Sequence, residues 1–247
     1  MNPFLEFRSV NVLSGNHFRL KNIDLSIFKG EKVALIGRSG SGKSTLFSVA
    51  NGTIPINKGE VIWKQQSISK LTQRKRVEIA TLWQDLRLID ELNVSQNINT
   101  GALGRHSIVW AIANLLAIIN STKSEDCIKA CYLPLDLRSS TINKLSGGQK
   151  QRVALARLLM QEADLMLLDE PFSNLDPSLI YKILKLLISK NSFKSISIPS
   201  TSIISLHRPD LLKYFTRVIG IKEGQIIIDK KPQDIQRNEL DNLYKNI

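Results

Sequence analysis

The stretch that decides the fold is Gly37-Arg38-Ser39-Gly40-Ser41-Gly42-Lys43-Ser44. It fits the pattern G-x-x-x-x-G-K-[ST], whose glycines let the backbone turn sharply and approach phosphate oxygens. The apolar run before it, Lys32–Ile36, is typical of a buried parallel strand, and Ser44–Ala50 after it has helical character. Because a strand precedes the loop and a helix follows it, the pattern predicts a site for the phosphates of a nucleotide.

The chemistry of this loop follows from its residue types. Exposed backbone N–H groups and the helix dipole attract negative charge, and Arg38 adds positive potential. Lys43 supplies a point charge between the outer phosphates, and the Ser44 hydroxyl is a ligand for Mg²⁺. The expected nucleotide contacts here are Gly37, Arg38, Ser39, Gly40, Ser41, Gly42, Lys43, Ser44 and Thr45.

A second segment, Leu165–Leu168, is an apolar strand that ends in two carboxylates, Asp169 and Glu170. The carboxyl end of a buried strand is where α/β sheets bind ligands. Asp169 is placed to hold Mg²⁺, and Glu170 is placed to orient or deprotonate an attacking water. Alone, this pattern also fits a strand that meets its solvated end, but beside a phosphate loop it predicts nucleotide hydrolysis.

A third segment, Leu145–Arg152, contains Ser146, Gly147 and Gly148 at a predicted helix start. Ser146 can cap the helix, and the glycines expose backbone N–H groups to an anion. A chain with a complete phosphate loop has no need of a second anion site for the same nucleotide. We therefore expect this site to serve a nucleotide bound to another subunit.

Residues 145–152 resemble the signature motif of the ABC ATPases. Other landmarks of that family follow in order: Gln84 resembles its glutamine-loop residue, Ser173–Asp176 its D-loop and His207 its switch histidine. The resemblance covers essentially the whole chain and implies ATP and Mg²⁺ as cofactors. It also implies a head-to-tail pair of chains, in which the signature motif of one covers the ATP of the other.

The resemblance further implies roles for individual residues. The implied catalytic residues are Glu170, His207, Gln84 and Lys43; the implied metal ligands are Ser44, Gln84 and Asp169; and the implied nucleotide contacts outside the phosphate loop are Ser146, Gly147, Gly148, Gln149 and Asp176. Without it, Gln84 reads as a surface glutamine and His207 as a structural histidine.

The expected fold class is α/β: a P-loop NTPase with a RecA-like mixed-sheet core, an N-terminal antiparallel β subdomain and an inserted helical subdomain. We expect one ABC ATPase domain over residues 1–247, with the core and β subdomain in 1–84 and 165–247 and the helical subdomain in 85–164. Apolar and polar residues alternate in the first third of the chain, whereas helical patterns dominate after Asp85. The other expected strands are Leu5–Val12, Phe18–Phe28, Glu60–Trp63, Ile79–Trp83, Ser202–Leu206, Arg217–Ile221 and Gln225–Asp229, and the other expected helices are Gln149–Met160 and Pro177–Lys190.

Two segments depart from simple expectations. The family usually stacks adenine on an aromatic side chain near position 13 or 14, where this chain has Leu13 and Ser14, so Leu13, His17 and Phe18 are the alternatives. The serine-rich segment Asn191–Ser202 reads as an exposed connection without visible chemistry.

Composition narrows the class further. There are 34 Lys and Arg against 22 Asp and Glu, a net charge of +12, which suits nucleic acid, an anionic membrane face, a polyanionic ligand or simply scattered lysine. The densest basic run, Lys70–Arg76, is short and lacks interleaved aromatics, so nucleic acid is not expected as a partner.

The two cysteines, Cys127 and Cys131, are expected to be buried or partly buried thiols of a reducing compartment. The most apolar stretch, Ile108–Ile119, is only about half of the roughly 20 residues that cross a bilayer.

A compact unit of this kind resembles the separate ATPase subunit of a transporter. Two stretches resemble the phosphonate-importer ATPases in particular. One is Asn97–Arg105, which is followed by Trp110, and the other is Ser205–Leu211 together with the residues that follow it. This resemblance implies phosphonate, phosphite or a related oxyanion as the cargo. It implies integral membrane permease subunits as partners and, indirectly, a periplasmic substrate-binding protein. It also implies a peripheral place on the cytoplasmic face of the inner membrane. Leu86, Leu88, Ile89 and Leu92 are candidate permease contacts or core residues. The alternatives are an ATPase of another importer or exporter, an ATP-driven dimerisation switch on a soluble partner, and a nucleic-acid ATPase.

Overall fold

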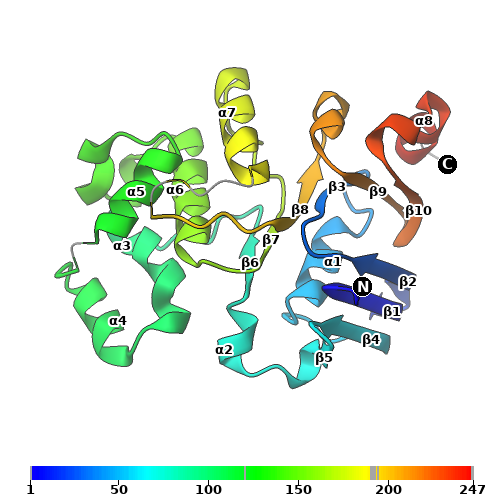
Figure 1. Cartoon of the computed structure of the whole chain (residues 1–247), viewed down its shortest axis with the longest axis horizontal. Coiled ribbons are helices and arrows are strands. Elements are labelled where there is room, and N and C mark those ends of the chain that lie inside the picture. The colour runs from blue at the N-terminus through cyan, green and yellow to red at the C-terminus, as the bar shows by residue number, and fades with distance from the viewer. Residues whose placement is uncertain (1, 120, 190–192, 194, 246–247) are drawn as a thin grey trace. The chain divides into compact units, whose positions relative to one another are not determined.

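The computed structural model describes residues 2–119, 121–189, 193 and 195–245. The chain divides into two compact units, which are described separately (Figure 1). Unit 1 comprises Met1–Thr72, Leu167–Glu170 and Ser200–Ile247, and unit 2 comprises Gln73–Met166 and Pro171–Pro199. The division into 1–84, 85–164 and 165–247 that we expect from the sequence stays a prediction.

The first sheet of unit 1 is antiparallel, with strand order β2-β1-β4-β5 (Figure 1). In its first strand Leu5 and Phe7 are buried, and beyond a register shift Val10 and Val12 are buried, which gives the sheet an apolar face. This confirms the antiparallel N-terminal sheet. Its strands are β1 (Leu5–Ser14), β2 (His17–Ile27), β4 (Lys58–Trp63) and the two-residue β5 (Gln66–Ser67).

The second sheet of unit 1 is mixed: its strands lie in the order β10-β9-β3-β8, followed by the part of β7 that belongs to this unit, Leu167–Leu168. The central strand β3 (Lys32–Ile36) is buried throughout and pairs in parallel with both neighbours, whereas β10 and β9 form an antiparallel hairpin. A strand buried on both faces is mostly apolar, as Val33–Ile36 are here after the buried Lys32. The other strands are β7 (Leu165–Leu168), β8 (Thr201–Leu206), β9 (Arg217–Lys222) and β10 (Gln225–Lys230). The helices of this unit are α1 (Lys43–Ala50), α8 (Arg237–Tyr244) and the 3₁₀ turns η1 (Ile68–Lys70), η5 (Pro209–Tyr214) and η6 (Pro232–Asp234).

Unit 2 is mainly helical, and α3 and α5 pack on α6 (Figure 1). Polar side chains cap the helix starts: Asn93 caps α3, Ser121 caps α5 and Ser146 caps α6. Its helices are α2 (Gln73–Arg76), α3 (Val94–Asn99), α4 (Ile108–Leu115), α5 (Thr122–Ala130), α6 (Gly147–Met160) and α7 (Pro177–Ile188), with the 3₁₀ turns η2 (Thr100–Arg105), η3 (Leu135–Ser139) and η4 (Ile142–Lys144) and the strand β6 (Ile79–Leu82).

The serine-rich segment differs from expectation. Residues 190–192 and 194 lie outside the described residues, and so does the predicted last residue of α7, Lys190. From Ile196 onward the segment is not an exposed connection, because Ile196 and Ile198 are buried and Thr201 begins β8. The prediction was wrong there because exposed Ser195 and Ser197 alternate with the buried isoleucines Ile196 and Ile198.

The burial of the cysteines and of the candidate permease contacts bears on two further predictions. Cys127 and Cys131 are buried free thiols, as predicted. Of the candidate permease contacts, Ile89 is exposed, whereas Leu92 is buried and packs the interior. Helix α4 covers only the first part of the apolar stretch that begins at Ile108. No helix in the described part of the chain has the length and apolar character needed to cross a membrane.

Candidate nucleotide-binding site

The phosphate loop lies between β3 and α1 in unit 1, and two of its glycines are required by close backbone contacts. A Cβ atom on Gly37 would lie 2.3 Å from the carbonyl oxygen of Ile221, and Gly37 has φ +153°. A Cβ atom on Gly42 would lie 2.8 Å from the carbonyl oxygen of Arg19, at φ +113°. Side chains at these positions would therefore displace the loop, which fits the predicted cradle for phosphate.

Lys43 is a buried cation at the start of α1. Its ammonium group donates to the carbonyl oxygens of Gly37, at 2.8 Å, and Arg38, at 2.9 Å. Burial lowers the pKa of Lys43, and the carboxylates of Glu170 and Asp169 oppose that shift. The ammonium group is thus held inside the loop by two carbonyls that phosphate oxygens can replace.

The predicted metal ligands Ser44 and Asp169 are in direct contact. The Ser44 hydroxyl donates to one carboxylate oxygen of Asp169 at 2.5 Å, and the Ser205 hydroxyl donates to the other at 2.7 Å. The Asp169 side chain is almost fully buried. Hydroxyl and carboxylate oxygens are the ligands that Mg²⁺ prefers alongside substrate phosphates, so these residues fit the ion.

Glu170 lies at the end of β7 in a conformation that is rare for glutamate. Its φ is +49°, its N–H donates to the Ser205 hydroxyl at 2.7 Å, and its carboxylate contacts Nε2 of His207. Left-handed backbone at a non-glycine residue costs about 1–2 kcal/mol and is found preferentially at functional sites. The hydrogen bond to Ser205 helps to keep Glu170 in this strained conformation, and the same hydroxyl positions Asp169.

Ser205 is the site residue that sequence reasoning missed as a ligand-positioning group. The sequence signal was its place near the end of a predicted strand, two residues before His207, whereas only the structure shows that β8 neighbours β7 in the sheet. Side chains at the carboxyl ends of neighbouring strands meet at one edge. In unit 1 the structure therefore brings together five predicted residues at this edge, namely Lys43, Ser44, Asp169, Glu170 and His207.

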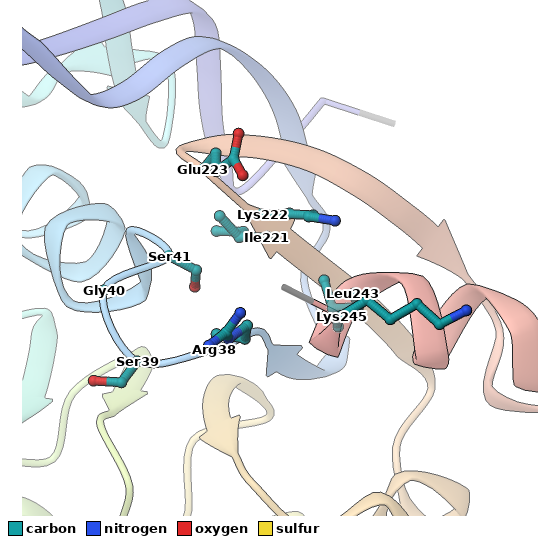
Figure 2. A pocket seen from close by; sticks show the side chains of 9 residues that line it. All are labelled: Arg38, Ser39, Gly40, Ser41, Ile221, Lys222, Glu223, Leu243 and Lys245. Carbon is teal, nitrogen blue, oxygen red and sulfur yellow. The ribbon is translucent and has the colours of Figure 1, made fainter. Parts of the chain in front are cut away.

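A pocket of about 160 Å³ opens beside the first half of the phosphate loop (Figure 2). Arg38, Ser39, Gly40 and Ser41 line it together with the β9–β10 turn and the end of α8. The Ser41 hydroxyl is buried, and the described residues provide it with no hydrogen-bond partner. The expected contacts 38–41 line this pocket, whereas Lys43, Ser44 and Asp169 do not.

The signature segment lies in unit 2. The Ser146 hydroxyl accepts from the N–H of Gln149, and the Gln149 side chain accepts from the N–H of Ser146 at 2.8 Å, a reciprocal cap. Ser146 and Gly147 are exposed, and a Cβ atom on Gly148 would lie 2.7 Å from the carbonyl oxygen of Asn174. The carbonyl group of Asn174 thus lies directly against this glycine, whereas Ser146 and Gly147 beside it are exposed.

Two further predicted site residues, Asp176 and Gln84, lie in unit 2. Asp176 is the N-cap of α7, and its hydrogen bond from the Ser178 hydroxyl, followed by that from the N–H of Leu179, lowers its pKa. Gln84 is exposed and follows β6. Because Gln84, Ser146–Gln149 and Asp176 lie in unit 2, their roles toward the residues of unit 1 stay predictions.

The three alternatives for the adenine contact lie on one hairpin of unit 1. Leu13 and Phe18 are opposite each other on β1 and β2, and they are 39% and 48% exposed. His17 pairs with Ser14 at the turn. The Lys21 ammonium lies 5.9 Å from the centroid of the Phe18 ring. Phe18 is therefore an exposed aromatic platform directly across from the position at which the family usually places its own.

We expect Phe18→Ala to raise the KM for ATP about fivefold or more, because stacking of a base on an aromatic ring contributes roughly 1–3 kcal/mol. Steady-state hydrolysis at varied ATP measures the change. Ile227→Ala, which truncates another exposed apolar side chain of unit 1, is the control and should leave the KM unaltered. An unchanged KM in Phe18→Ala would leave Leu13 and His17 as the candidate base contacts.

A phosphate loop next to a carboxylate pair at a strand end defines a nucleotide-hydrolysing protein of the P-loop class. The capped helix that follows the signature segment indicates the ABC ATPases within that class. A family profile described as ABC transporter matches residues 20–173. The chain belongs to this family and is therefore an ATPase that uses ATP and Mg²⁺.

Named relatives agree with this assignment. The chain is 32% identical over 246 residues to the phosphonates import ATP-binding protein PhnC of Staphylococcus aureus (strain USA300), covering 97% of this chain and 94% of that protein. The dimeric ATP-binding cassette MJ0796, solved with ADP and Pi, is 25% identical with a TM-score of 0.78, covering 94% of this chain and 100% of the other. The structure of cbiO1 from Clostridium perfringens, part of the ABC transporter complex cbiONQ, is 28% identical with a TM-score of 0.75, covering 97% and 93%.

Proposed function

We propose that this chain is the ATP-hydrolysing subunit of an ABC importer for phosphonate, phosphite or a related oxyanion. The observation that carries the proposal is the similarity to a phosphonates import ATP-binding protein along 97% of the chain. In this proposal residues 1–247 form one ABC ATPase domain, with the core and β subdomain in 1–84 and 165–247 and the helical subdomain in 85–164. An ATPase of another importer or exporter is the alternative.

The proposed cycle uses two copies of the chain. ATP occupies each phosphate loop, and the copies close head to tail, so that Ser146 and Gly148 of one complete the γ-phosphate site of the other. The reciprocal cap of Ser146 and Gln149 and the exposure of Ser146 and Gly147 support this role, and so does the dimeric form of MJ0796. A nucleotide whose γ-phosphate is contacted from both sides is sequestered from bulk water during hydrolysis.

In the hydrolytic step, Glu170 accepts a proton from the attacking water, and Lys43 and His207 stabilise the charge that develops on the γ-phosphate. The contact of Glu170 with His207 and the carbonyl-held ammonium group of Lys43 support these roles. Ser44, Asp169 and Gln84 would hold Mg²⁺, which would neutralise phosphate charge. Asp176 and Gln149 contribute nucleotide contacts of the paired copy.

Permease subunits are the proposed partners, with a periplasmic substrate-binding protein as an indirect one and no nucleic acid expected. This assigns the chain a peripheral place on the cytoplasmic face of the membrane. A hollow of about 340 Å³ in unit 2, lined by Trp83, Arg87, Thr100, Gly101 and Arg157 among others, supports a docking site next to Gln84. Ile89, which is 42% exposed, adds apolar surface in the same loop.

Uptake measurements test the cargo. We expect deletion of this subunit to abolish uptake of phosphonate or phosphite, and the unaltered chain to restore it. The Glu170→Gln variant, expressed at the same level, should not restore it. If uptake of both anions survives the deletion, the cargo assignment fails, whereas co-purification with a polytopic membrane protein would still support an ABC transporter of another cargo.

A further inference from the structure

Helix α4 of unit 2 has a polar inner side and an apolar outer side. Its buried residue is Asn114, whereas five large aliphatic side chains on the opposite side are 51–75% exposed. The exposed side chains are Ile108, Val109, Ile112, Leu115 and the C-cap Leu116. Their spacing of i, i+1, i+4, i+7 and i+8 places them on one face of the helix. A surface helix normally has the reverse arrangement, so α4 turns outward the kind of face that other helices bury.

A buried network of amide side chains holds α4 in this orientation. Nδ2 of Asn114 donates to the carbonyl oxygen of Gln96 at 3.1 Å, and Oδ1 of Asn114 accepts from Nδ2 of Asn99 at 2.9 Å. Nε2 of Gln96 donates to the carbonyl oxygens of Asn114 and Leu115, each at 2.9 Å. Turning the apolar face inward would break these bonds, and buried amides without hydrogen bonds are costly. The fold therefore keeps the apolar face of α4 on the outside.

The sequence around this face contains no acidic residue. Residues 92–124 include neither Asp nor Glu, whereas Arg105, His106 and Lys123 lie within the stretch. Arg105 and Lys123 form ion pairs with Glu162. The surroundings of the apolar face thus lack the negative charge that an anionic surface would repel.

Additional positive charge comes from the basic helix α2, which lies beside the segment that leads into α4. Its Arg74 and Lys75 are exposed, and both belong to the densest basic run of the chain. The turn η2 contacts both α2 and α4. A Cβ atom on Gly104 of η2 would lie 2.1 Å from Cγ1 of Val77, the residue after α2. In Figure 1 both helices lie at the lower edge of the view, so unit 2 presents a basic helix close to an apolar one.

We propose that the apolar face of α4 and the basic helix α2 together form a surface that binds an anionic lipid bilayer. An aliphatic helix face with adjoining Lys and Arg holds a helix in the plane of a bilayer, because the aliphatic side chains enter the acyl region and the cations lie among the headgroup phosphates. Helix α4 has 8 residues, far fewer than the roughly 20 that cross a bilayer, so it would lie along the surface. This lipid contact rests on the proposed peripheral place of the chain at a membrane.

A bilayer fits this face better than a protein partner does. Specific protein interfaces carry about one hydrogen bond per 100–200 Å². The five outward side chains of α4 are aliphatic and offer neither donors nor acceptors, which acyl chains do not require. Trp110 of α4 is half-buried and stacks on His106 with ring centroids 4.3 Å apart. Tryptophan is enriched at the headgroup level of membranes, where its ring has one apolar and one wet side.

Co-sedimentation of the full-length chain with lipid vesicles tests the proposed surface. The unaltered chain should bind vesicles of phosphatidylcholine and phosphatidylglycerol at least about tenfold more tightly than vesicles of phosphatidylcholine alone, since each basic side chain near an anionic surface adds about fivefold. Ile108→Gln/Ile112→Gln should weaken binding to the mixed vesicles about tenfold or more, because two aliphatic side chains no longer leave water. Arg74→Gln/Lys75→Gln should weaken it by a similar factor and reduce the preference for the anionic lipid. Without vesicles, both variants should hydrolyse ATP within about twofold of the unaltered chain.

Two matched double variants serve as controls. Leu135→Gln/Ile227→Gln alters two other exposed apolar side chains, and Lys58→Gln/Lys185→Gln removes two other exposed positive charges. Neither should change vesicle binding by more than about twofold. If the lysine control weakens binding as much as Arg74→Gln/Lys75→Gln does, the attraction comes from the net charge of the whole chain, and the proposed surface is wrong.

The remaining outcomes distinguish the lipid contact from the proposed function. Absence of binding to mixed vesicles, or equal binding by all variants, overturns the lipid contact and leaves the proposed function standing. If Ile108→Gln/Ile112→Gln loses co-purification with the permease but keeps vesicle binding, the face docks a protein and the lipid contact is again overturned. If phosphonate and phosphite uptake survive deletion of the subunit while the variants lose vesicle binding, the proposed function fails and the lipid contact is supported.

The unaltered chain provides a second measurement in case a variant does not fold. Its binding to mixed vesicles should weaken at least about tenfold when salt is raised from about 0.05 to about 0.5 M, because salt screens the attraction between exposed cations and headgroup phosphates. Binding that is insensitive to salt would overturn the role of α2 in the surface.

Discussion

Glu170→Gln is expected to lower ATP turnover at least about a hundredfold while ATP still binds, because a positioned general base contributes roughly 10²–10⁴-fold to rate. Glutamine keeps the shape of the side chain and its contact with His207, and the strained backbone at φ +49° is unaffected by the exchange of an oxygen for an amide. Only the capacity to accept a proton from water is lost. Phosphate release at saturating ATP measures the turnover, and nucleotide retention measures binding.

The same variant tests the head-to-tail pair. With hydrolysis blocked, ATP should hold two copies together, so size-exclusion chromatography with ATP should show a dimer that the unaltered chain forms only transiently. Glu60→Gln, at an exposed glutamate of β4, is the control and should behave as the unaltered chain. Retained turnover in Glu170→Gln would remove Glu170 from the role of base, and a monomer that binds ATP would argue against the pair.

Lys43→Ala is expected to weaken ATP binding about a hundredfold or more. The ammonium group makes two hydrogen bonds to loop carbonyls, and phosphate oxygens replace these acceptors when the nucleotide binds. Each hydrogen bond to a charged group contributes about 1.5–3 kcal/mol, so the loss of two corresponds to at least two powers of ten in affinity. Titration calorimetry with ATP and Mg²⁺ measures the change.

Lys58→Ala provides the matched control, since Lys58 is exposed at the start of β4. It removes the same charge from unit 1 and should leave the affinity within about twofold. If Lys43→Ala binds ATP as tightly as Lys58→Ala does, the phosphate loop holds its ligand through backbone N–H groups alone, and the assigned role of Lys43 is wrong.

Local pattern accounts for much of the fold. The predicted strands Lys32–Ile36 and Leu165–Leu168 agree with the observed bounds, because a short apolar run between turn signals has few other places to begin or end. The sequence indicated Ser146 as a cap, but the helix expected from Gln149 begins at Gly147, where Ser146 and Gln149 form a reciprocal cap. Strand β1, by contrast, continues beyond the predicted Val12 to Ser14, because pairing with β2 extends it.

The errors and omissions have a common cause, which is contact between residues far apart in the chain. Serines at 195 and 197 suggested solvent, but Ile196 is buried by structure that no local pattern reveals. Ser205 is an unremarkable strand residue until β8 is known to neighbour β7. Arg157 reads as a helix-surface cation until its guanidinium is found on the carbonyls of residues 86 and 87.

The amino-acid sequence by itself determined that Gly37–Ser44 is a phosphate loop, because steric freedom at glycine, the helix dipole and a lysine at fixed spacing act over only a few residues. Only the tertiary structure decided which side chains from other parts of the chain surround that loop. It placed the Ser44 hydroxyl on Asp169, it made Ser205 the hydroxyl that positions both carboxylates, and it set Phe18 across from Leu13. These arrangements depend on strand order and register, which follow from burial of the whole chain rather than from any one segment.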